Sequence, residues 1–244
     1  PCCPNLIMRS PRMADDLACL VRHKVELVIT SVGSPAPVIP ALHDAGVPVF
    51  ADVASLEQCW RALDAGADGL ILLTAGAGGQ TGWANPFAFV RAVRRQYDGP
   101  VTLAGGISDG RAILAAQVLG ADLVYLGTRF IATDQSGASD DYRAALVTAS
   151  LDDVRLSDRV GGIPASLLAS WLDAQDAGDS ADSDGFVQDR LLSNRTAWSA
   201  GHSVSGVHRV LTVDELVDEL ATEYTAAERA SQSRFSHPEV VSHD

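Results

Sequence analysis

The sequence predicts an α/β fold, a TIM-type (β/α)8 barrel present in part and joined to a smaller, mainly helical second domain. Short apolar runs alternate with segments of helical periodicity, the pattern of a parallel sheet. The phrase Gly-Ala-Asp recurs at residues 66–68 and 120–122, between a helix and a strand each time, so one βα unit repeats. Three successive predicted strands run into small residues, at Gly78-Gly79, Gly105-Gly106 and Gly127-Thr128. A doubly wound sheet is the alternative, but such strand ends favour the barrel, whose last loops commonly hold phosphate.

Five strands carry this prediction, at Glu26–Val32, Val47–Val53, Gly69–Thr74, Val101–Ala104 and Leu123–Leu126. The short Leu6–Met8 is a further candidate. A closed barrel of this type needs eight strands, and an open edge would expose backbone donors and acceptors. We therefore expect these strands to be the carboxyl-terminal portion of a barrel, parallel and in sequence order. The exposed apolar edge is expected at Glu26–Val32 or just before it, and the start at Pro1 suggests a missing amino-terminal segment.

Helical periodicity fills the intervals between these strands, and capping signals set its limits. The predicted helices include Arg12–His23, Ser55–Gly66, Asn85–Tyr97, Arg111–Leu119 and Asp140–Ala149. Beyond residue 149 the periodic strands disappear, and Gly161–Leu172 and Leu211–Ala227 are predicted to be helical. The Asp-rich stretch 173–184 is interpreted as a solvated loop. Three regions follow: residues 1–135 as barrel, 136–228 as a helical cap with a return helix, and 229–244 as a disordered tail.

A glycine-rich loop follows the most apolar strand, in the sequence GLILLTAGAGGQTG from Gly69. Glycine lets the main chain approach a flat or anionic ligand and adopt positive φ. Gly78, Gly79 and the adjoining Gln80 are therefore candidates for a cofactor seat at the end of a parallel strand. A simple flexible turn is the alternative, which the two later glycine-bearing strand ends make less favourable.

Composition limits the classes of partner. The net charge is −13 with only 18 Lys and Arg, which argues against nucleic acid. No apolar run approaches the roughly 20 residues that span a bilayer, so we expect no membrane partner and a cytoplasmic protein, with a homodimer as the candidate assembly. The cysteines show no metal-site spacing and are interpreted as free thiols: Cys2, Cys3, Cys19 and Cys59.

Four motifs in order, AGAGGQTG, LAGGISDGRAI, GADLVYLGTRFIAT and WSAGHSVSGV, resemble the nitronate monooxygenase family, also called 2-nitropropane dioxygenases. The resemblance extends from about Arg12 to Tyr224. It implies an FMN-dependent barrel that acts without a metal on a small-molecule substrate and oxygen. It further implies that Gly79 lies against the flavin, and that the FMN phosphate is held by Gly105, Gly106, Gly127 and Thr128. Glycine amides and a hydroxyl at strand ends suit an anion without Lys or Arg.

Gln80 departs from the family pattern, in which a histidine commonly follows the paired glycines and removes a carbon-bound proton. A neutral amide cannot act as a general base, but it can donate a hydrogen bond to a nitro, carbonyl or thioester oxygen. Gln80 is therefore expected to orient a substrate that arrives ionised, or simply to pack beside the flavin. His202 is the one other histidine kept as a catalytic candidate, against the plainer interpretation of an exposed loop residue.

Three functions follow from these observations. The first is oxidation of alkyl nitronates or related carbanions by oxygen, with FMN carrying the electrons. The second is NAD(P)H-dependent reduction of an enoyl thioester, because class II enoyl-acyl carrier protein reductases are similar in motif and fold. The third is a non-catalytic flavin-binding module. Without an amino-terminal segment, the chain is expected to aggregate or to bind FMN poorly.

Overall fold

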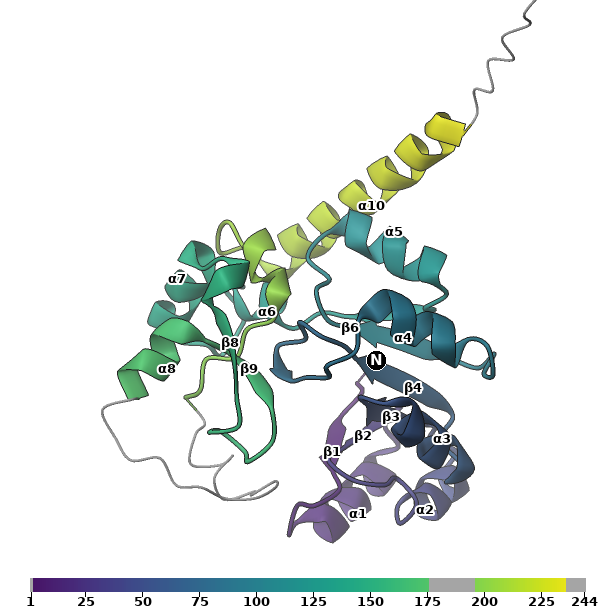
Figure 1. The fold of residues 1–244 in the computed structure, drawn as a ribbon. Helices are drawn as coiled ribbons and strands as arrows, with labels where there is room; N and C mark the ends of the chain where they lie inside the picture. Colours follow the sequence, from purple (N-terminus) through teal and green to yellow (C-terminus); the bar gives the residue numbers. More distant parts are fainter. Residues whose placement is uncertain (1, 176–195, 236–244) are drawn as a thin grey trace, which may run out of the picture.

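The computed structural model describes residues 2–175 and 196–235. Its centre is a six-stranded parallel sheet in the order β1-β2-β3-β4-β6-β7 (Figure 1). The strands are β1 (Asn5–Ile7), β2 (Val28–Ser31), β3 (Val49–Val53), β4 (Gly69–Leu73), β6 (Val101–Ala104) and β7 (Leu123–Tyr125). The five predicted strands are thus confirmed as parallel and in sequence order, and β1 overlaps the sixth candidate, one residue earlier. That the sheet belongs to an eight-stranded barrel stays a prediction.

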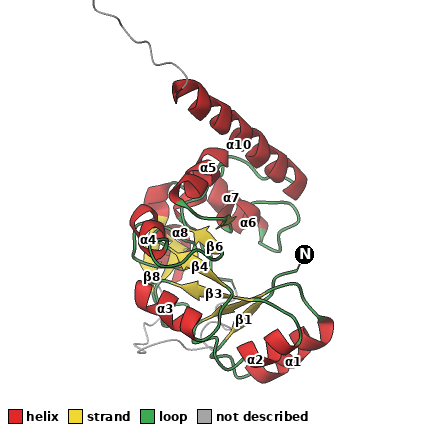
Figure 2. Cartoon of the chain, turned by 90° about the vertical axis from the view of Figure 1, so that its right-hand side faces the viewer, coloured by secondary structure: helices red, strands yellow, loops and turns green. Residues whose placement is uncertain are grey.

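Helices follow the strands along the outer face of this sheet (Figure 2). They are α1 (Met13–His23), α2 (Ile39–Asp44), α3 (Leu56–Asp64), α4 (Pro86–Val93) and α5 (Gly110–Leu119). Side chains set their starts: Ser55 accepts the Gln58 amide at 3.2 Å, and Asp109 accepts the Ala112 amide at 2.8 Å. Ser55 and Asp109 are therefore the N-cap residues of α3 and α5.

The repeated Gly-Ala-Asp phrase has a structural reason. The Asp68 carboxylate accepts the Val49 amide at 2.8 Å, and the Asp122 carboxylate accepts the Val101 amide, also at 2.8 Å. Each aspartate therefore satisfies the first amide of the neighbouring strand, as its own amide bonds a carbonyl there. The repeat fixes the register of successive βα units.

Two apolar layers form on opposite faces of the sheet because side chains alternate along each strand. The outer layer packs strands β3, β4 and β6 against α3, α4 and α5, with Leu70, Leu72 and Val90 fully buried. The inner layer contains Ile29, Phe50, Ile71, Leu73 and Ala104. Leu73 and Ala104 of this inner layer lie at the carboxyl-terminal ends of β4 and β6.

The later part of the chain differs from the prediction. An antiparallel sheet in the order β5-β9-β8 joins β5 (Gly79–Gln80) to β9 (Ala165–Leu168) and β8 (Val154–Ser157). The predicted helix over Gly161–Leu172 is therefore wrong in its first half, because Ala165–Leu168 is wholly buried strand. A short apolar run cannot be assigned to helix or strand by periodicity alone. The helix that does form is α8 (Ala169–Gln175).

The other helices of this region are α6 (Thr128–Ile131), α7 (Asp140–Thr148) and α10 (Val213–Phe235), with 3-10 turns η1 (Leu151–Asp153) and η2 (His202–Gly206). Reciprocal hydrogen bonds between Thr212 and Glu215 cap the start of α10. The first part of the predicted disordered tail is helical, since α10 runs to Phe235 in a segment without glycine or proline. Most of the Asp-rich stretch 173–184 and the end of the predicted tail lie outside the described residues.

Helix α10 lies along α5, from which it is distant in the sequence, and its end extends away from the rest of the chain (Figure 1). The Gly110 amide donates to the Glu223 carboxylate at 2.9 Å, so α10 also caps the start of α5. No helix in residues 2–175 and 196–235 is both long and apolar enough to cross a membrane. All four cysteines are free thiols, and only Cys59 is buried.

Candidate functional site

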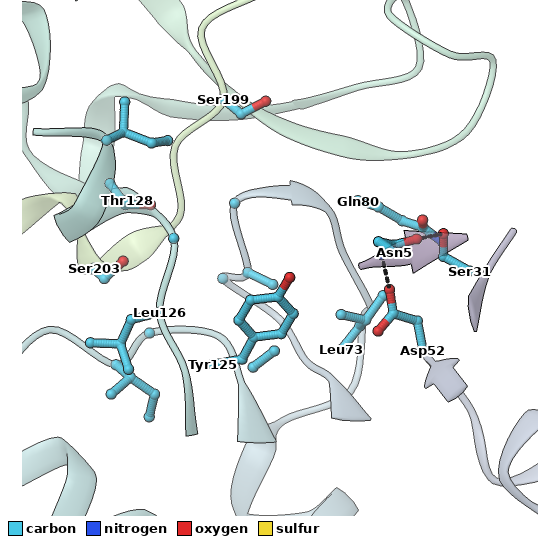
Figure 3. A pocket seen from close by; sticks show the side chains of 18 residues that line it. Asn5, Ser31, Asp52, Leu73, Gln80, Tyr125, Leu126, Thr128, Ser199 and Ser203 are labelled. Carbon is cyan, nitrogen blue, oxygen red and sulfur yellow. Dashed lines mark hydrogen bonds between the residues drawn. The ribbon is translucent and has the colours of Figure 1, made fainter. Parts of the chain in front are cut away.

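A pocket of about 270 Å³ lies where the strand-end loops of the central sheet meet the segment 199–203 (Figure 3). Backbone lines much of it, because glycines at positions 76, 78, 106 and 127 contribute no side chain. Apolar side chains come from Leu73, Ile107 and Leu126. Neither Lys, Arg nor His is among the residues that line it. An anionic ligand here would have to be held by backbone amides and hydroxyls.

The glycine loop after β4 is held by a segment far along the chain. Gly79 pairs with Ser166 and Gln80 with Ala165, so β9 fixes the direction of both residues. A Cβ atom on Gly78 would lie 2.7 Å from the Gly201 amide nitrogen, which shows how closely the two backbones approach. The loop is therefore a docked segment with a defined conformation, which the alternative of a flexible turn does not describe. Gly78 and Gln80 line the pocket, and Gly79 adopts a φ of +68° beside them.

The other two strand ends complete the backbone lining. A Cβ atom added to Gly106 or Gly127 would meet no atom within 4 Å, so both main-chain segments face open space. Gly105 differs, because a Cβ there would lie 2.4 Å from the Thr74 hydroxyl oxygen, and it packs against the end of β4 instead of lining the pocket. Of the predicted pair, Gly106 is the residue that reaches the pocket.

Thr128 has a role that its sequence position alone does not indicate. Its side chain is buried and its Oγ1 accepts the Gly201 amide at 3.0 Å. The hydroxyl proton stays available to a ligand in the pocket, which Thr128 lines. One side chain thus joins the end of β7 to the segment that closes the pocket.

His202 does not line the pocket. Its ring is exposed and lies against Gly76, where a Cβ would be 2.6 Å from the imidazole Nδ1. Its backbone amide donates to the Gly76 carbonyl at 2.9 Å. His202 therefore braces the outside of the glycine loop. The assignment of Gln80 and His202 as catalytic, and of the glycines and Thr128 as cofactor-binding, stays a prediction.

The structure adds polar residues that the motifs did not identify: Asn5, Ser31, Asp52 and Tyr125, with Ser199 and Ser203 from the closing segment. The first four come from the inner face of the central sheet, and their common signal is a polar residue in or beside an apolar strand. Ser31 Oγ donates to Asn5 Oδ1 at 2.7 Å, and Asn5 Nδ2 donates to Asp52 Oδ2 at 3.4 Å (Figure 3).

Asp52 is the electrostatically unusual member of this group. Burial raises the pKa of its carboxyl from 3.8 to about 7, and the Asn5 hydrogen bond opposes that shift. Its Oδ1 atom is buried and has no hydrogen-bond partner among the described residues. Burial, and secondarily the charge of Asp52, also raises the pKa of Tyr125 above its usual value. The pocket thus holds a carboxyl that can exchange a proton near neutral pH.

Comparison with known proteins matches this chain to a family. The family described as Nitronate monooxygenase matches residues 7–223. A nitronate monooxygenase of Paraburkholderia phytofirmans is 34% identical over 141 residues, which are 54% of this chain and 38% of that protein. A Rhodococcus jostii protein named (3aS,4S,5R,7aS)-5-hydroxy-7a-methyl-1-oxo-octahydro-1H-indene-4-carboxyl-CoA dehydrogenase is 31% identical over 149 residues, 61% of this chain and 42% of that protein.

Solved structures agree in fold. FabK from Thermotoga maritima superposes with a TM-score of 0.81 at 27% identity, over 96% of this chain and 79% of FabK. The chain spans less than half the length of these two curated relatives. The match to the family nevertheless covers most of the chain, and its motifs build the pocket described above. The chain therefore belongs to the nitronate monooxygenase family.

Proposed function

We propose that this protein is an FMN-dependent oxidoreductase that oxidises alkyl nitronates or related carbanions with molecular oxygen. The observation that supports the proposal most directly is the pocket itself, where three glycine-bearing strand ends converge in a chain of this family. Because the chain spans less than half the length of the curated relatives named above, the activity of the whole protein is proposed on this ground and not transferred from them.

The residues present fit FMN. Gly106 and Gly127 face open space, and the Thr128 hydroxyl lies in the same lining, so a phosphate can approach main-chain amides closely. We propose that Gly105 supports this cradle from behind and that Gly78 and Gly79 lie beside the ring. When bound, FMN supplies the group that accepts the electrons of the substrate. The local amides allow an anion to bind although the protein's net charge is −13.

The remaining lining positions the substrate. We propose that the Gln80 side-chain amide donates a hydrogen bond to a nitro oxygen, which orients an anion that arrives already ionised. Leu73, Ile107 and Leu126 exclude water from the same space. Exclusion of water strengthens the polar contacts that remain.

Oxygen uptake by the FMN-loaded protein with ethyl nitronate tests this function. We expect flavin absorption bands on the purified protein and nitronate-dependent oxygen consumption. Gln80→Leu is expected to raise KM for the nitronate about tenfold, the loss of roughly one hydrogen bond to a charged group. Gln80→Glu is the isosteric comparison, and it should be worse because it adds a negative charge. Bound FMN without oxygen uptake would contradict the proposal and favour a non-catalytic flavin-binding module.

A second candidate is NAD(P)H-dependent reduction of an enoyl thioester. The Rhodococcus relative named as a dehydrogenase of a carboxyl-CoA supports it, as does the likeness to FabK. Gln80 could then donate to the thioester carbonyl. Anaerobic mixing with NADPH separates the two, since bleaching of the flavin bands that an enoyl thioester reverses belongs to the reductase alone.

We further propose that the central sheet is part of a (β/α)8 barrel and that residues 136–228 form a second domain. Six parallel strands in sequence order, with an apolar inner layer, support the barrel. Strands β1 and β7 are the two edges of this sheet, and a closed barrel would pair the free edge of each with a further strand. Their edge amides are therefore predicted to exchange slowly with deuterium in the functional protein. Rapid exchange at both edges would contradict closure. We also propose that the protein is cytoplasmic and forms a homodimer.

A further inference from the structure

Asp52 is a carboxylic acid in a strand that is otherwise apolar. Strand β3 has the sequence VFADV, and Phe50 and Asp52 point to the inner face of the sheet. Phe50 joins the inner apolar layer, whereas Asp52 lies two residues further along the strand, nearer the loops, and lines the pocket together with Gln80. The chain has thus placed an ionisable group at the base of the pocket where an apolar residue would pack.

The protein satisfies only half of this carboxyl group. Oδ2 accepts the Asn5 amide at 3.4 Å, and that amide is itself held by the Ser31 hydroxyl at 2.7 Å. Oδ1 is buried without a hydrogen-bond partner among the described residues. An orphaned buried acceptor is costly, so its retention indicates a partner that arrives with a ligand.

No cation of the lining offsets the charge on Asp52. Tyr125 on β7 is the titratable group that faces it across the pocket, and Asn5, Ser31 and Gln80 are neutral (Figure 3). Burial consequently holds the pKa of Asp52 at about 7. A base with a pKa near the working pH is suited to proton transfer from carbon.

We propose that Asp52 is the general base of this site, taking the carbon-bound proton of a neutral nitroalkane or a comparably acidic carbon acid. The proposal rests on the proposed function, because it uses the same pocket and the same product class. The C–H bond breaks as an O–H bond forms on Oδ1, and the electron pair left on carbon delocalises into the nitro group. The nitronate so formed is the substrate of the proposed oxidation by oxygen. Asp52 thereby supplies the base that Gln80 cannot.

The other candidates fit this role less well. Gln80 has no basic atom. His202 has one, but its ring is exposed outside the pocket and lies against Gly76. Asp52 is the basic carboxylate within the lining.

The test compares Asp52→Asn with Asp64→Asn, the same substitution at an exposed position on α3. In the FMN-loaded proteins, Asp52→Asn should lower nitroethane oxidation about 100-fold or more, the usual contribution of a general base, and change ethyl nitronate oxidation less than about threefold. Asp64→Asn should change neither rate. Asp52→Glu, which keeps a base, should retain part of the nitroethane activity.

A measurement on the FMN-free protein is independent of turnover. Carbon-13 NMR of labelled aspartate carboxyls should show one group that titrates near pH 7, and Asp52→Asn should remove that resonance. If Asp52→Asn does not fold, the titration of the unsubstituted protein decides. The absence of any aspartate carboxyl that titrates between about pH 6 and pH 8 would overturn the proposal.

The outcomes separate this proposal from the proposed function. Undiminished nitroethane oxidation in Asp52→Asn overturns the role of Asp52 alone, as does an unsubstituted protein that oxidises nitronate but not nitroethane. Equal loss of both activities with FMN still bound shows that Asp52 positions the ligand, and also overturns the base role. An FMN-loaded protein that oxidises neither compound overturns the proposed function, and with it the use of Asp52 on nitro compounds.

Discussion

The carboxyl of Asp52 makes the free energy of unfolding depend on pH. Its pKa rises from 3.8 to about 7 in the folded state. The folded state therefore binds the proton more tightly, and this contribution to stability is fully present below about pH 4 and is lost as the pH rises through 7. Above pH 7 the Asp52 carboxyl is charged in both states, but only in the folded protein is that charge buried.

Asp52→Asn should accordingly stabilise the protein at high pH. We expect it to exceed the unsubstituted protein in free energy of unfolding by on the order of 2 to 4 kcal/mol at pH 8, and to lose that advantage by pH 4. Urea denaturation at pH 4, 6 and 8 measures the difference, with Asp64→Asn as the control. A difference that is the same at all three pH values would show that Asp52 is not the titrating group.

Thr128 should contribute to both folding and ligand binding. Thr128→Val keeps the β-branched shape but leaves the buried Gly201 amide without its acceptor, at a cost of about 1 to 3 kcal/mol in unfolding free energy. FMN affinity should fall by roughly 1 to 2 kcal/mol, the scale of one hydrogen bond to a charged group. Denaturation and fluorescence titration with FMN measure the two effects, and Thr128→Ser should preserve both. Unchanged FMN affinity in Thr128→Val would remove the hydroxyl from the cradle.

The sequence could predict the backbone part of the site but not its polar side chains. Gly78, Gly106 and Gly127 are recognisable because glycine after an apolar strand has few uses other than close approach. Asn5, Ser31 and Asp52 become neighbours only through the register of β1, β2 and β3, which places all three on the inner face. Such a register depends on pairing between distant segments, and no local pattern specifies it.

Among the elements, β5 is a two-residue strand whose conformation depends on distant partners. Gly78→Ala would place a Cβ 2.7 Å from the Gly201 nitrogen, a contact that backbone cannot relieve cheaply. We expect a loss of about 1 to 3 kcal/mol in unfolding free energy, as for other overpacked sites, together with weaker FMN binding. Thermal denaturation measures the first. Gly137→Ala, where a Cβ meets nothing within 4 Å, should change little, and equal effects in the two variants would contradict the close docking.

The elements differ in how far local sequence determined them. The Gly-Ala-Asp repeat and the predicted helix start at Ser55 indicated βα units correctly because their interactions lie within one unit. The β8 and β9 hairpin was missed because Ala165–Leu168 is buried on both faces, which removes the alternation that marks a half-buried strand. Its edge partner β5 lies some 85 residues earlier in the chain, beyond the range of any window.

At the scale of the whole molecule, Arg129 joins three separate parts. It is 6% exposed and donates to the Ser108 carbonyl at 3.0 Å, to the Gly206 carbonyl, and to the Glu219 carboxylate at 2.7 Å. The loop after β6, the turn η2 and helix α10 therefore meet at one guanidinium. A buried cation that satisfies several acceptors orders the segments around it.

Arg129→Met should release α10 from this junction. It leaves two carbonyls without a donor, so we expect a loss of about 2 to 4 kcal/mol in unfolding free energy and faster deuterium exchange along α10. The matched control is Arg209→Met, which removes an exposed partner of the same Glu219 and should cost less than about 1 kcal/mol. Comparable losses in the two variants would show that the network contributes little beyond the exposed ion pair.

The contact between the glycine loop and the segment 199–203 has a consequence in time. The two backbones touch, yet roughly 120 residues separate them along the chain, so a ribosome adding about 5 to 20 residues per second completes the second roughly 6 to 25 s after the first. During that interval the strand-end loops have been synthesised, but the segment 199–203 that covers them has not. A nascent chain must therefore pass through a state with an open, apolar strand-end surface, where a chaperone can bind and FMN cannot yet be enclosed.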